Sequence, residues 1–290
     1  MDEKTNERKC IVMNLLDGKM ISSKLKEEYK SRVERLEKKP NLVMIRIGND
    51  AAAALYTKMK GKVCQELGIP FTEYELNASI TQEELLKQVE KLNNSEDVTA
   101  ILIESPIPNH LNILEAFDRI APEKDVDGLN SINLGALAAG HPDFIPATPL
   151  GIMRLLKEYR IEIEGKKCVV VGRSNLVGRP MALCLLNANG TVTVCHSRTK
   201  NLGEITKEAD ILVVAIGKPK FITAEMVKEG AVVVDVGINR IPGEKKVVGD
   251  VDFVNVKEKC DYITPVPGGV GPMTIISLIE NLLKTVETNS

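Results

Sequence analysis

Two side chains of one predicted helix, Tyr56 and Lys60, are of types that could act together on a substrate. Because they are four residues apart, a helix would place them as neighbours on one face. An aromatic ring can stack on a flat substrate, and an amine beside it can transfer a proton. For the pair alone, the default interpretation is a basic face in contact with solvent, because Lys58 and Lys62 belong to the same predicted helix.

Three acidic residues stand where they could complete such a site. Glu104 directly follows the apolar run 100–103, and a polar residue at the carboxyl end of a parallel strand is well placed for chemistry. Asp125 and Asp127, in the sequence KDVDG, could bind a cation or simply form a turn. Their spacing does not decide between these alternatives, and we predict no metal site.

A second candidate site is the glycine-rich stretch 168–180, CVVVGRSNLVGRP. The predicted strand ends at Gly172, and Gly178 follows six residues later, where a helix should begin. Backbone N–H groups and the positive end of a helix dipole can together hold a phosphate. Ser174 stands where the usual dinucleotide motif has its second glycine, so the motif is weak on its own.

The residues after the next predicted strand, 191–195, indicate which dinucleotide would bind. An acid at this place accepts hydrogen bonds from a ribose 2′-hydroxyl, whereas a base accommodates a 2′-phosphate. This chain has Ser197, Arg198 and Lys200 and no acid, and Arg173 adds another positive group. The forked guanidinium donors match phosphate oxygens two at a time. The pattern favours NADP over NAD; the alternative is a basic loop end in contact with solvent.

Glycines also follow the next two predicted strands. Gly217 comes two residues after Ala215, which ends one strand, and Gly237 follows the other strand and precedes Ile238. Any one of these glycines could be a simple turn. Together with the two glycines of the loop they would let a ligand lie across the carboxyl edge of one sheet.

The elements that must position these residues alternate between strand and helix, which predicts parallel sheets built from βαβ units. With 290 residues the chain has room for two domains. We therefore expect an α/β fold of two α/β domains, the C-terminal one a Rossmann-like dinucleotide-binding domain. The Pro- and Asp/Asn-rich stretch 121–149 is expected to be a loop with the domain junction at its end. The expected elements are strands 41–47, 71–76, 100–103, 169–171, 191–195, 211–215 and 232–236, and helices 20–39, 51–67, 81–92, 111–120, 150–159 and 275–286.

Composition excludes several other classes of protein. A net charge of −2 provides no basic field to recruit nucleic acid or an anionic membrane. No apolar run approaches the roughly 20 residues that span a bilayer, and the charged N-terminus lacks the apolar core of a signal peptide. The six cysteines, Cys10 among them, are scattered and are interpreted as reduced thiols. We expect a cytoplasmic protein.

The motifs together resemble the methylenetetrahydrofolate dehydrogenase/methenyltetrahydrofolate cyclohydrolase family. They keep the family order and span almost the whole chain. The matching segments are LDGK near the start, Y-x-x-x-K at 56–60, APEKDVDG at 121–128, TPLG at 148–151, VVVGRSNLVGRPMA at 169–182, CHSRT at 195–199, DVGINR at 235–240, KVVGDV at 246–251 and YITPVPGGVGPMT at 262–274.

The resemblance implies a folate-binding, catalytic domain of residues 1–149 plus 273–290 and an NADP-binding domain of residues 150–272, with the active cleft between them. It implies oxidation of 5,10-methylenetetrahydrofolate to 5,10-methenyltetrahydrofolate, then hydrolysis to 10-formyltetrahydrofolate, in a homodimer formed through the C-terminal half. Tyr56 would stack on the folate, Lys60 would be the central catalytic residue and Asp127 would bind the pterin. Pro267, Gly268 and Gly269 would line the folate site. The residues implied for NADP are Thr148, Gly172, Arg173, Ser174, Val177, Gly178, Ser197, Arg198, Ala215, Gly217, Gly237, Ile238 and Thr274.

Three positions depart from the family pattern. Where the family usually reads VQLP, this chain reads IESP, so Glu104 replaces a neutral glutamine. A carboxylate there would favour protonated Lys60, and a charged lysine is a poor general base. We therefore hypothesise that hydride transfer persists while hydrolysis is weak or absent, unless Glu104 itself is the base or is exposed and harmless. Ala53 replaces a serine and Ala147 a cysteine, which we expect to change affinity rather than abolish activity.

Other functions stay open from sequence alone. A non-catalytic paralogue that still binds nucleotide or folate would fit the changes at Glu104 and Ala53. A monofunctional dehydrogenase, or a different NADP oxidoreductase of the same two-domain plan, would also fit. The intact set of Tyr56, Lys60, Asp127 and 267–269 argues against the non-catalytic paralogue and against the different oxidoreductase.

Overall fold

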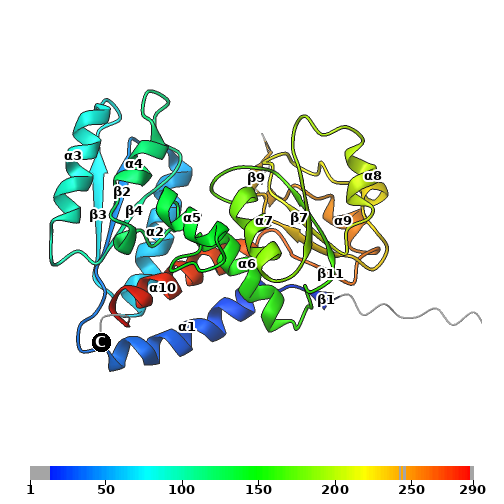
Figure 1. Cartoon of the computed structure of the whole chain (residues 1–290), viewed down its shortest axis with the longest axis horizontal. Coiled ribbons are helices and arrows are strands. Elements are labelled where there is room, and N and C mark those ends of the chain that lie inside the picture. Colours follow the sequence, from blue (N-terminus) through cyan, green and yellow to red (C-terminus); the bar gives the residue numbers. More distant parts are fainter. Residues whose placement is uncertain (1–13, 242, 244–245, 288–290) are drawn as a thin grey trace, which may run out of the picture.

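The computed structural model describes residues 14–241, 243 and 246–287. They form two α/β units side by side, each built on its own sheet, and two long helices run beneath both units (Figure 1). The predicted fold class is confirmed. Cys10 and both ends of the predicted folate domain lie outside the described residues.

The smaller sheet has three parallel strands in the order β3-β2-β4. Every residue of β2 and β4 is buried, which explains their nearly continuous apolar sequences. The elements of this unit are β2 (Leu42–Ile47), α2 (Ala51–Glu66), β3 (Phe71–Leu76), α3 (Gln82–Asn93), β4 (Ala100–Ile103) and α4 (Ile113–Arg119).

Side-chain caps fix where two of these helices begin. The carboxylate of Asp50 accepts hydrogen bonds from the N–H groups of Ala52 (2.9 Å) and Ala53 (2.8 Å) and so starts α2, the helix that carries Tyr56 and Lys60. α3 begins with a capping box, because Thr81 and Glu84 each bind the other's backbone N–H.

The larger sheet has six parallel strands in the order β1-β11-β8-β7-β5-β6. Its long strands match the predicted ones, but its two shortest strands were not predicted. Of these, β1 belongs to the larger sheet, although the division predicted from sequence assigns its residues to the folate domain. The strands are β1 (Asn14–Leu15), β5 (Lys167–Val171), β6 (Thr191–Cys195), β7 (Ile211–Val214), β8 (Val232–Asp235) and β11 (Tyr262–Ile263), and a separate antiparallel pair is formed by β9 (Asn239–Arg240) and β10 (Val247–Val248).

The stretch 121–149 is not the continuous loop that its composition predicted. It contains a short 3-10 helix, η1 (Pro122–Lys124), and a helix, α5 (Ser131–Ala138), whose first turn is capped by the Asn130 side chain at 2.7 Å from the N–H of Ile132. Asn130, one of the residues that suggested a loop, is therefore a helix cap. The next helix, α6 (Ala147–Glu158), begins three residues earlier than predicted.

One apolar core continues across both units. The first helix, α1 (Gly18–Arg35), ends before the predicted 39, but its stripe of Ile21, Leu25, Tyr29 and Val33 is buried as predicted. It packs with α6 and α10 against both sheets. The remaining helices are α7 (Gly178–Asn187), α8 (Leu202–Thr206), η2 (Ala224–Met226), α9 (Phe253–Val256) and α10 (Val270–Glu287).

The last helix joins the two units. α10 begins at Val270, five residues before the predicted start at 275, so Thr274 lies in its first turns. Further along, the amide of Asn281 donates to the backbone oxygens of Val126 and Ile145, each at 2.8 Å. These bonds fix α10 to the segment that carries Asp127.

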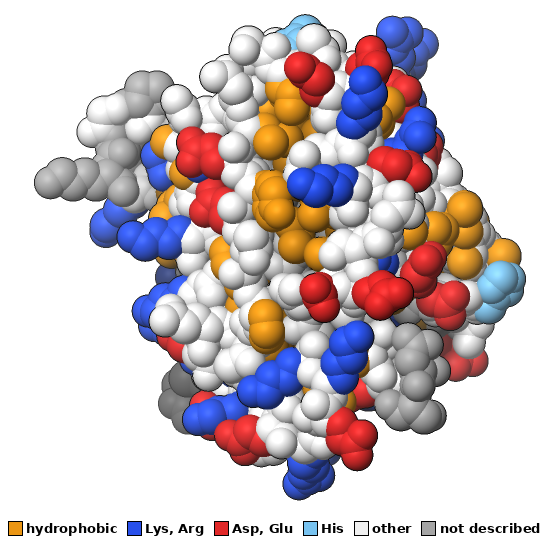
Figure 2. Space-filling model, turned by 90° about the vertical axis from the view of Figure 1, so that its left-hand side faces the viewer, with side chains coloured by type: hydrophobic (Ala, Val, Ile, Leu, Met, Phe, Trp, Pro, Cys, Tyr) orange, Lys and Arg blue, Asp and Glu red, His pale blue; other side chains and the backbone are white. Residues whose placement is uncertain are grey.

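The surface carries charges of both signs. At the end of the molecule formed by α3 and β3, acidic and basic side chains are interspersed around a band of hydrophobic ones (Figure 2). This agrees with the small net charge of −2. Within the described ranges no helix combines the length and the apolar character needed to cross a bilayer.

Candidate active site

A cavity of about 270 Å³ lies between the two units, where the smaller sheet faces α6, α10 and the loops of the larger sheet. It brings together residues that are far apart in the sequence and that come from both predicted domains. The lining residues are Tyr56, Lys60, Ile103, Glu104, Ser105, Asp127, Leu129, Ala147, Thr148, Leu176, Val236, Ile238, Val270, Gly271 and Thr274.

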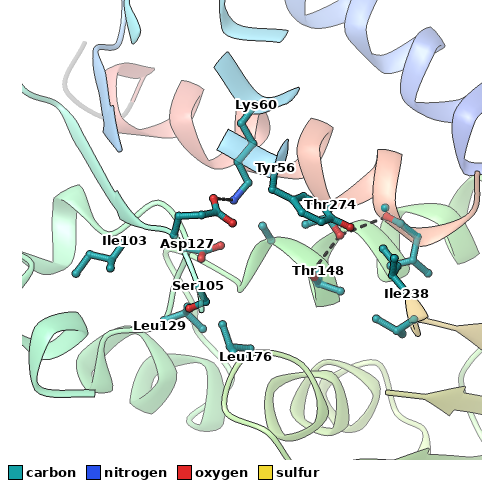
Figure 3. Close-up of a pocket in the computed structure, with 15 residues that line it drawn as sticks. Tyr56, Lys60, Ile103, Ser105, Asp127, Leu129, Thr148, Leu176, Ile238 and Thr274 are labelled. Carbon is teal, nitrogen blue, oxygen red and sulfur yellow. Dashed lines mark hydrogen bonds and ion pairs between the residues drawn. The ribbon is translucent and has the colours of Figure 1, made fainter. Parts of the chain in front are cut away.

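The centre of the cavity is an ion pair. The Lys60 Nζ atom lies 2.8 Å from Glu104 Oε2, and the two side chains are only 10% and 8% exposed. Figure 3 shows Lys60 reaching down from α2 toward this carboxylate and toward Asp127. Burial raises the pKa of Glu104, and the Lys60 ammonium opposes that rise. The expectation that Glu104 could be exposed and harmless is excluded.

Asp127 lies beside the same ion pair in the cavity. Burial raises its pKa, while the Lys60 ammonium and the backbone N–H of Ala147 favour its charged form. Ala147 is the first residue of α6, so the carboxylate also lies at the positive end of a helix. The site therefore contains one cation between two carboxylates.

Asp125 has a different role from Asp127. Its buried carboxylate accepts hydrogen bonds from the N–H of Asn130 at 2.8 Å and from the Asn133 amide at 2.9 Å. Burial raises the pKa of Asp125 to about 6. Of the two alternatives for KDVDG, these bonds support a turn at Asp125. Among the described residues, no three or more His, Cys, Asp or Glu side chains are grouped so that they could hold a metal ion.

Tyr56 stands at the boundary between this cavity and a second one of about 390 Å³. Burial raises the pKa of the Tyr56 phenol, and the nearby Glu104 carboxylate raises it further. The second cavity is lined on one side by Leu55 and Met59 of α2 and on the other by the loop 265–272, including the predicted Pro267, Gly268 and Gly269. The two cavities form one continuous cleft, since both include Tyr56, Val236 and Ile238.

The two alanines that depart from the family pattern have different surroundings. Ala147 lines the cavity as expected, and its backbone N–H serves Asp127. Ala53 is buried in α2 and lines neither cavity, so it is not part of the cleft wall. Ser105 is a polar residue that we had not singled out: its buried hydroxyl has no hydrogen-bond partner among the described residues.

The glycine loop between β5 and α7 has a conformation that requires its glycines. Gly172 has φ 126°, and a Cβ atom there would lie 2.2 Å from the Ala215 carbonyl oxygen. A Cβ at Gly178 would lie 2.3 Å from the carbonyl oxygen of Gly172. Ser174 replaces the usual glycine without strain, because its hydroxyl accepts the N–H groups of Val177 (3.2 Å) and Gly178 (3.4 Å). We call this tight turn the phosphate cradle, because it lies at the carboxyl end of β5 and the start of α7, where dinucleotide-binding folds hold a phosphate.

The predicted reader of a 2′-phosphate lies beside the cradle. β5 and β6 pair in register up to Val171 and Cys195, so Arg173 and the turn after β6 emerge next to each other. Arg173, Ser197 and Arg198 are all exposed there, and none of them forms an ion pair with a described residue. Like Ala215 and Gly217 after β7, these residues line neither cavity and lie along the carboxyl edge of the larger sheet.

The remaining predicted cofactor residues connect this edge to the ion pair. The hydroxyls of Thr148 on α6 and Thr274 on α10 are 3.1 Å apart, on the side of the cavity opposite Asp127 (Figure 3). Ile238 is 48% exposed and lines both cavities. Leu176, which we did not predict, extends from the glycine loop into the same space.

Comparison with known proteins agrees with this geometry. Residues 16–127 match the model of the tetrahydrofolate dehydrogenase/cyclohydrolase catalytic domain, and residues 146–290 match that of its NAD(P)-binding domain. The chain is 52% identical over 278 residues to the bifunctional protein FolD of Campylobacter hominis, covering 95% of this chain and 98% of that protein.

Solved structures give the same result. The bifunctional FolD enzyme of Campylobacter jejuni is 48% identical, with a TM-score of 0.93 over 96% of this chain and all of that one. The Trypanosoma brucei enzyme, solved with NADP and an inhibitor, is 36% identical, with a TM-score of 0.90 over 94% of this chain and 97% of that one. The chain belongs to the tetrahydrofolate dehydrogenase/cyclohydrolase family, as its motifs predicted.

Proposed function

We propose that this chain oxidises 5,10-methylenetetrahydrofolate with NADP, and that hydrolysis of the methenyl product to 10-formyltetrahydrofolate is the weaker of its two activities. Family membership and the cleft support the oxidation. The observation that carries the imbalance is the buried ion pair between Lys60 and Glu104 at 2.8 Å. A monofunctional dehydrogenase is the limiting case of the same proposal.

The cleft positions the folate. The pterin enters the 270 Å³ cavity, where the Asp127 carboxylate accepts hydrogen bonds from its amino and ring N–H groups. The Tyr56 ring stacks on the folate at the boundary with the second cavity, whose Pro/Gly loop lines the far side. In this proposed pose the methylene bridge lies near the Lys60–Glu104 pair and faces Thr148 and Thr274.

The dinucleotide lies along the carboxyl edge of the larger sheet. The backbone of the Gly172 loop holds its phosphates, with Ser174, Val177 and Gly178 at the start of α7. When bound there, NADP supplies the acceptor for the hydride that leaves the methylene carbon. The residues beyond β7 and β8, namely Ala215, Gly217, Gly237 and Ile238, orient the nicotinamide end.

The charges around Lys60 favour oxidation over hydrolysis. Loss of hydride leaves a methenyl cation, and two carboxylates near one ammonium give this cavity a net negative charge that stabilises developing positive charge. Hydrolysis needs a base to activate water. An ion pair favours the charged form of its lysine, which is a poor base, so we expect that Lys60, paired with Glu104 at 2.8 Å, does not serve as that base. The negative site also holds the cationic intermediate more tightly.

Two separate assays test this proposal. NADPH formation from methylenetetrahydrofolate measures oxidation, and loss of methenyltetrahydrofolate in the absence of dinucleotide measures hydrolysis, with the buffer rate subtracted. We expect clear NADPH formation and slow hydrolysis. Binding of NADP without NADPH formation would point instead to a non-catalytic paralogue.

The preference for NADP depends on Arg173. Arg173→Gln is expected to raise the KM for NADP by about tenfold or more, because a fork of charged donors to the 2′-phosphate is lost, and to leave the KM for NAD nearly unchanged. Lys207→Gln removes an exposed positive charge elsewhere in the same unit and serves as the control. Equal changes with NADP and NAD would show that Arg173 does not read the 2′-phosphate.

We also infer that residues 1–149 plus 273–290 form the folate-binding unit and that residues 150–272 form the NADP-binding unit. The exception is β1, which belongs to the larger sheet. A cytoplasmic location is supported by the five described cysteines, which are all free and buried, as in proteins of reducing compartments. The small net charge of −2 favours small-molecule partners over nucleic acid or membrane.

The assembly that fits the chain is a homodimer formed through the C-terminal half. β6 is an edge strand of the larger sheet, with Val194 40% exposed, and Leu186 on the adjacent α7 is 56% exposed. An exposed edge of this kind can pair with a second copy. Val194→Lys is expected to convert the dimer to a monomer in sedimentation velocity, whereas Ile132→Lys, on α5, leaves it intact. A wild-type chain that sediments as a monomer would rule this assembly out.

A further inference from the structure

Two buried carboxylates lie beneath the carboxyl edge of the larger sheet, outside the residues assigned so far. Asp250 is fully buried and Asp235, the last residue of β8, is 3% exposed. Neither forms an ion pair with any described residue. Burying charged groups without a counter-charge is costly unless hydrogen bonds satisfy them, so their partners indicate what they are for.

Every described hydrogen bond to the Asp250 carboxylate comes from one of two loops. Its Oδ2 atom accepts the N–H groups of Ile216 (2.7 Å) and Gly217 (2.9 Å). Its Oδ1 atom accepts the N–H of Lys218 and the side-chain amide of Asn239, each at 2.8 Å. One side chain therefore ties the loop that follows β7 to the segment that follows β8.

Asp235 holds Asp250 in this position. Its carboxylate accepts the backbone N–H groups of Asp250, Val251 and Gly237, each at 2.9 Å. The approach is possible only because of glycine: a Cβ at Gly237 would lie 2.3 Å from Asp250 Oδ1, and one at Gly249 would lie 1.8 Å from Asp235 Oδ2. The sequences DVG and GDV thus encode one interlocked unit.

The two tied loops face the two reactants. The loop after β7 begins at Ala215, whose carbonyl oxygen packs against Gly172 of the phosphate cradle. The segment after β8 contains Ile238, which lines the cavity that holds Lys60. A change in the relative position of these loops would alter the distance between the dinucleotide and the folate.

We propose that Asp250 is a positioning residue for hydride transfer, which locks the dinucleotide loop 215–218 to the cleft segment 236–240. It touches neither reactant and acts through the backbone of these loops. This inference rests on the proposed function, because it assumes that NADP lies along this edge.

The main test is Asp250→Asn. An amide in this place puts an NH₂ group against backbone N–H donors, so part of the tie is lost. We expect the dissociation constant and the KM for NADP to rise by about tenfold or more and kcat to fall, while the KM for methylenetetrahydrofolate changes by less than about threefold. Asp210→Asn is the matched control, since Asp210 accepts the N–H of Lys167 at the opposite edge of the same sheet.

A second variant covers the case in which Asp250→Asn does not fold. Asn239→Ala removes only the bond to the cleft segment, so kcat should fall while the dissociation constant for NADP changes little. Unchanged kcat in Asn239→Ala, or equal losses for both substrates in a folded Asp250→Asn, would overturn the inference. Failure of the wild-type protein to bind NADP would instead overturn the proposed function.

Discussion

Glu104→Gln is expected to raise the rate of methenyltetrahydrofolate hydrolysis by about tenfold or more and to lower the rate of NADP-dependent oxidation by about three- to tenfold. The neutral amide keeps a hydrogen bond to Lys60 but no longer holds it as an ammonium by charge pairing, so the amine becomes available as a base. The same change removes the negative charge that stabilises the forming methenyl cation. The two assays described above measure both effects.

Glu104→Asp separates the charge from the shape of the side chain. It keeps a carboxylate near Lys60 but shortens the side chain, so hydrolysis should stay as slow as in the wild-type protein. If both variants hydrolyse equally fast, the geometry of the pair matters and its charge does not. Hydrolysis in the wild-type protein at a rate comparable to oxidation, unchanged by Glu104→Gln, would contradict the hypothesis.

Most of the fold could be predicted because local sequence patterns determine its long elements. The β-branched runs of β5, β7 and β8 and the capping box of α3 depend on neighbouring residues alone. The strands β1 and β11 could not be predicted in this way. Each has two residues and forms through distant pairing: Asn14 of β1 lies opposite Tyr262 of β11, nearly the whole length of the chain away, and β11 also pairs with β8.

The helix α5 was missed for a different reason. Asparagine is common both in loops and at helix N-caps, and composition alone does not distinguish the two. The amide of Asn130 caps α5 and also donates to the carbonyl oxygen of Ile120 at 2.9 Å, so its role depends on contacts ten residues away.

The candidate site could likewise be predicted only in part. Tyr56, Lys60 and Asp127 could be named in advance because their motifs match the family, and the helix spacing of the first two supported the match. The tie made by Asp250 could not, since all of its described partners except the Asn239 amide are backbone N–H groups, which leave no mark in a sequence. The one available signal was the pair DVG and GDV, in which an acid and a glycine recur beside each other.

In the Glu104→Gln background, where the amine can act as a base, Lys60→Met is expected to lower the rate of methenyltetrahydrofolate hydrolysis by about 100-fold. Methionine keeps an unbranched side chain in the cavity but has neither a charge nor a proton to transfer. As a single change, Lys60→Met leaves Glu104 buried without its counter-ion. Breaking such a pair typically costs about 3–5 kcal/mol of the free energy of unfolding.

The pH dependence of this loss of stability follows from the direction in which the pKa of Glu104 is shifted. Burial already raises the pKa of Glu104, and removal of Lys60 takes away the charge that opposes the rise. A carboxyl group whose pKa is higher in the folded than in the unfolded state stabilises the fold at low pH, and this contribution is lost as the pH rises through the folded-state pKa. Lys60→Met should therefore be most destabilised at neutral and alkaline pH, as urea unfolding between about pH 5 and pH 8 would measure.

The double variant, Lys60→Met with Glu104→Gln, separates stability from catalysis. It contains no buried charge at this pair, so it should recover most of the lost free energy of unfolding and lose the pH dependence, because an unpaired carboxylate was the cause of both. It should still hydrolyse methenyltetrahydrofolate slowly, because no amine is present to activate water. If the double variant hydrolysed as fast as Glu104→Gln alone, the base would have to be another residue of the cavity, and Asp127 is the other carboxylate that lines it.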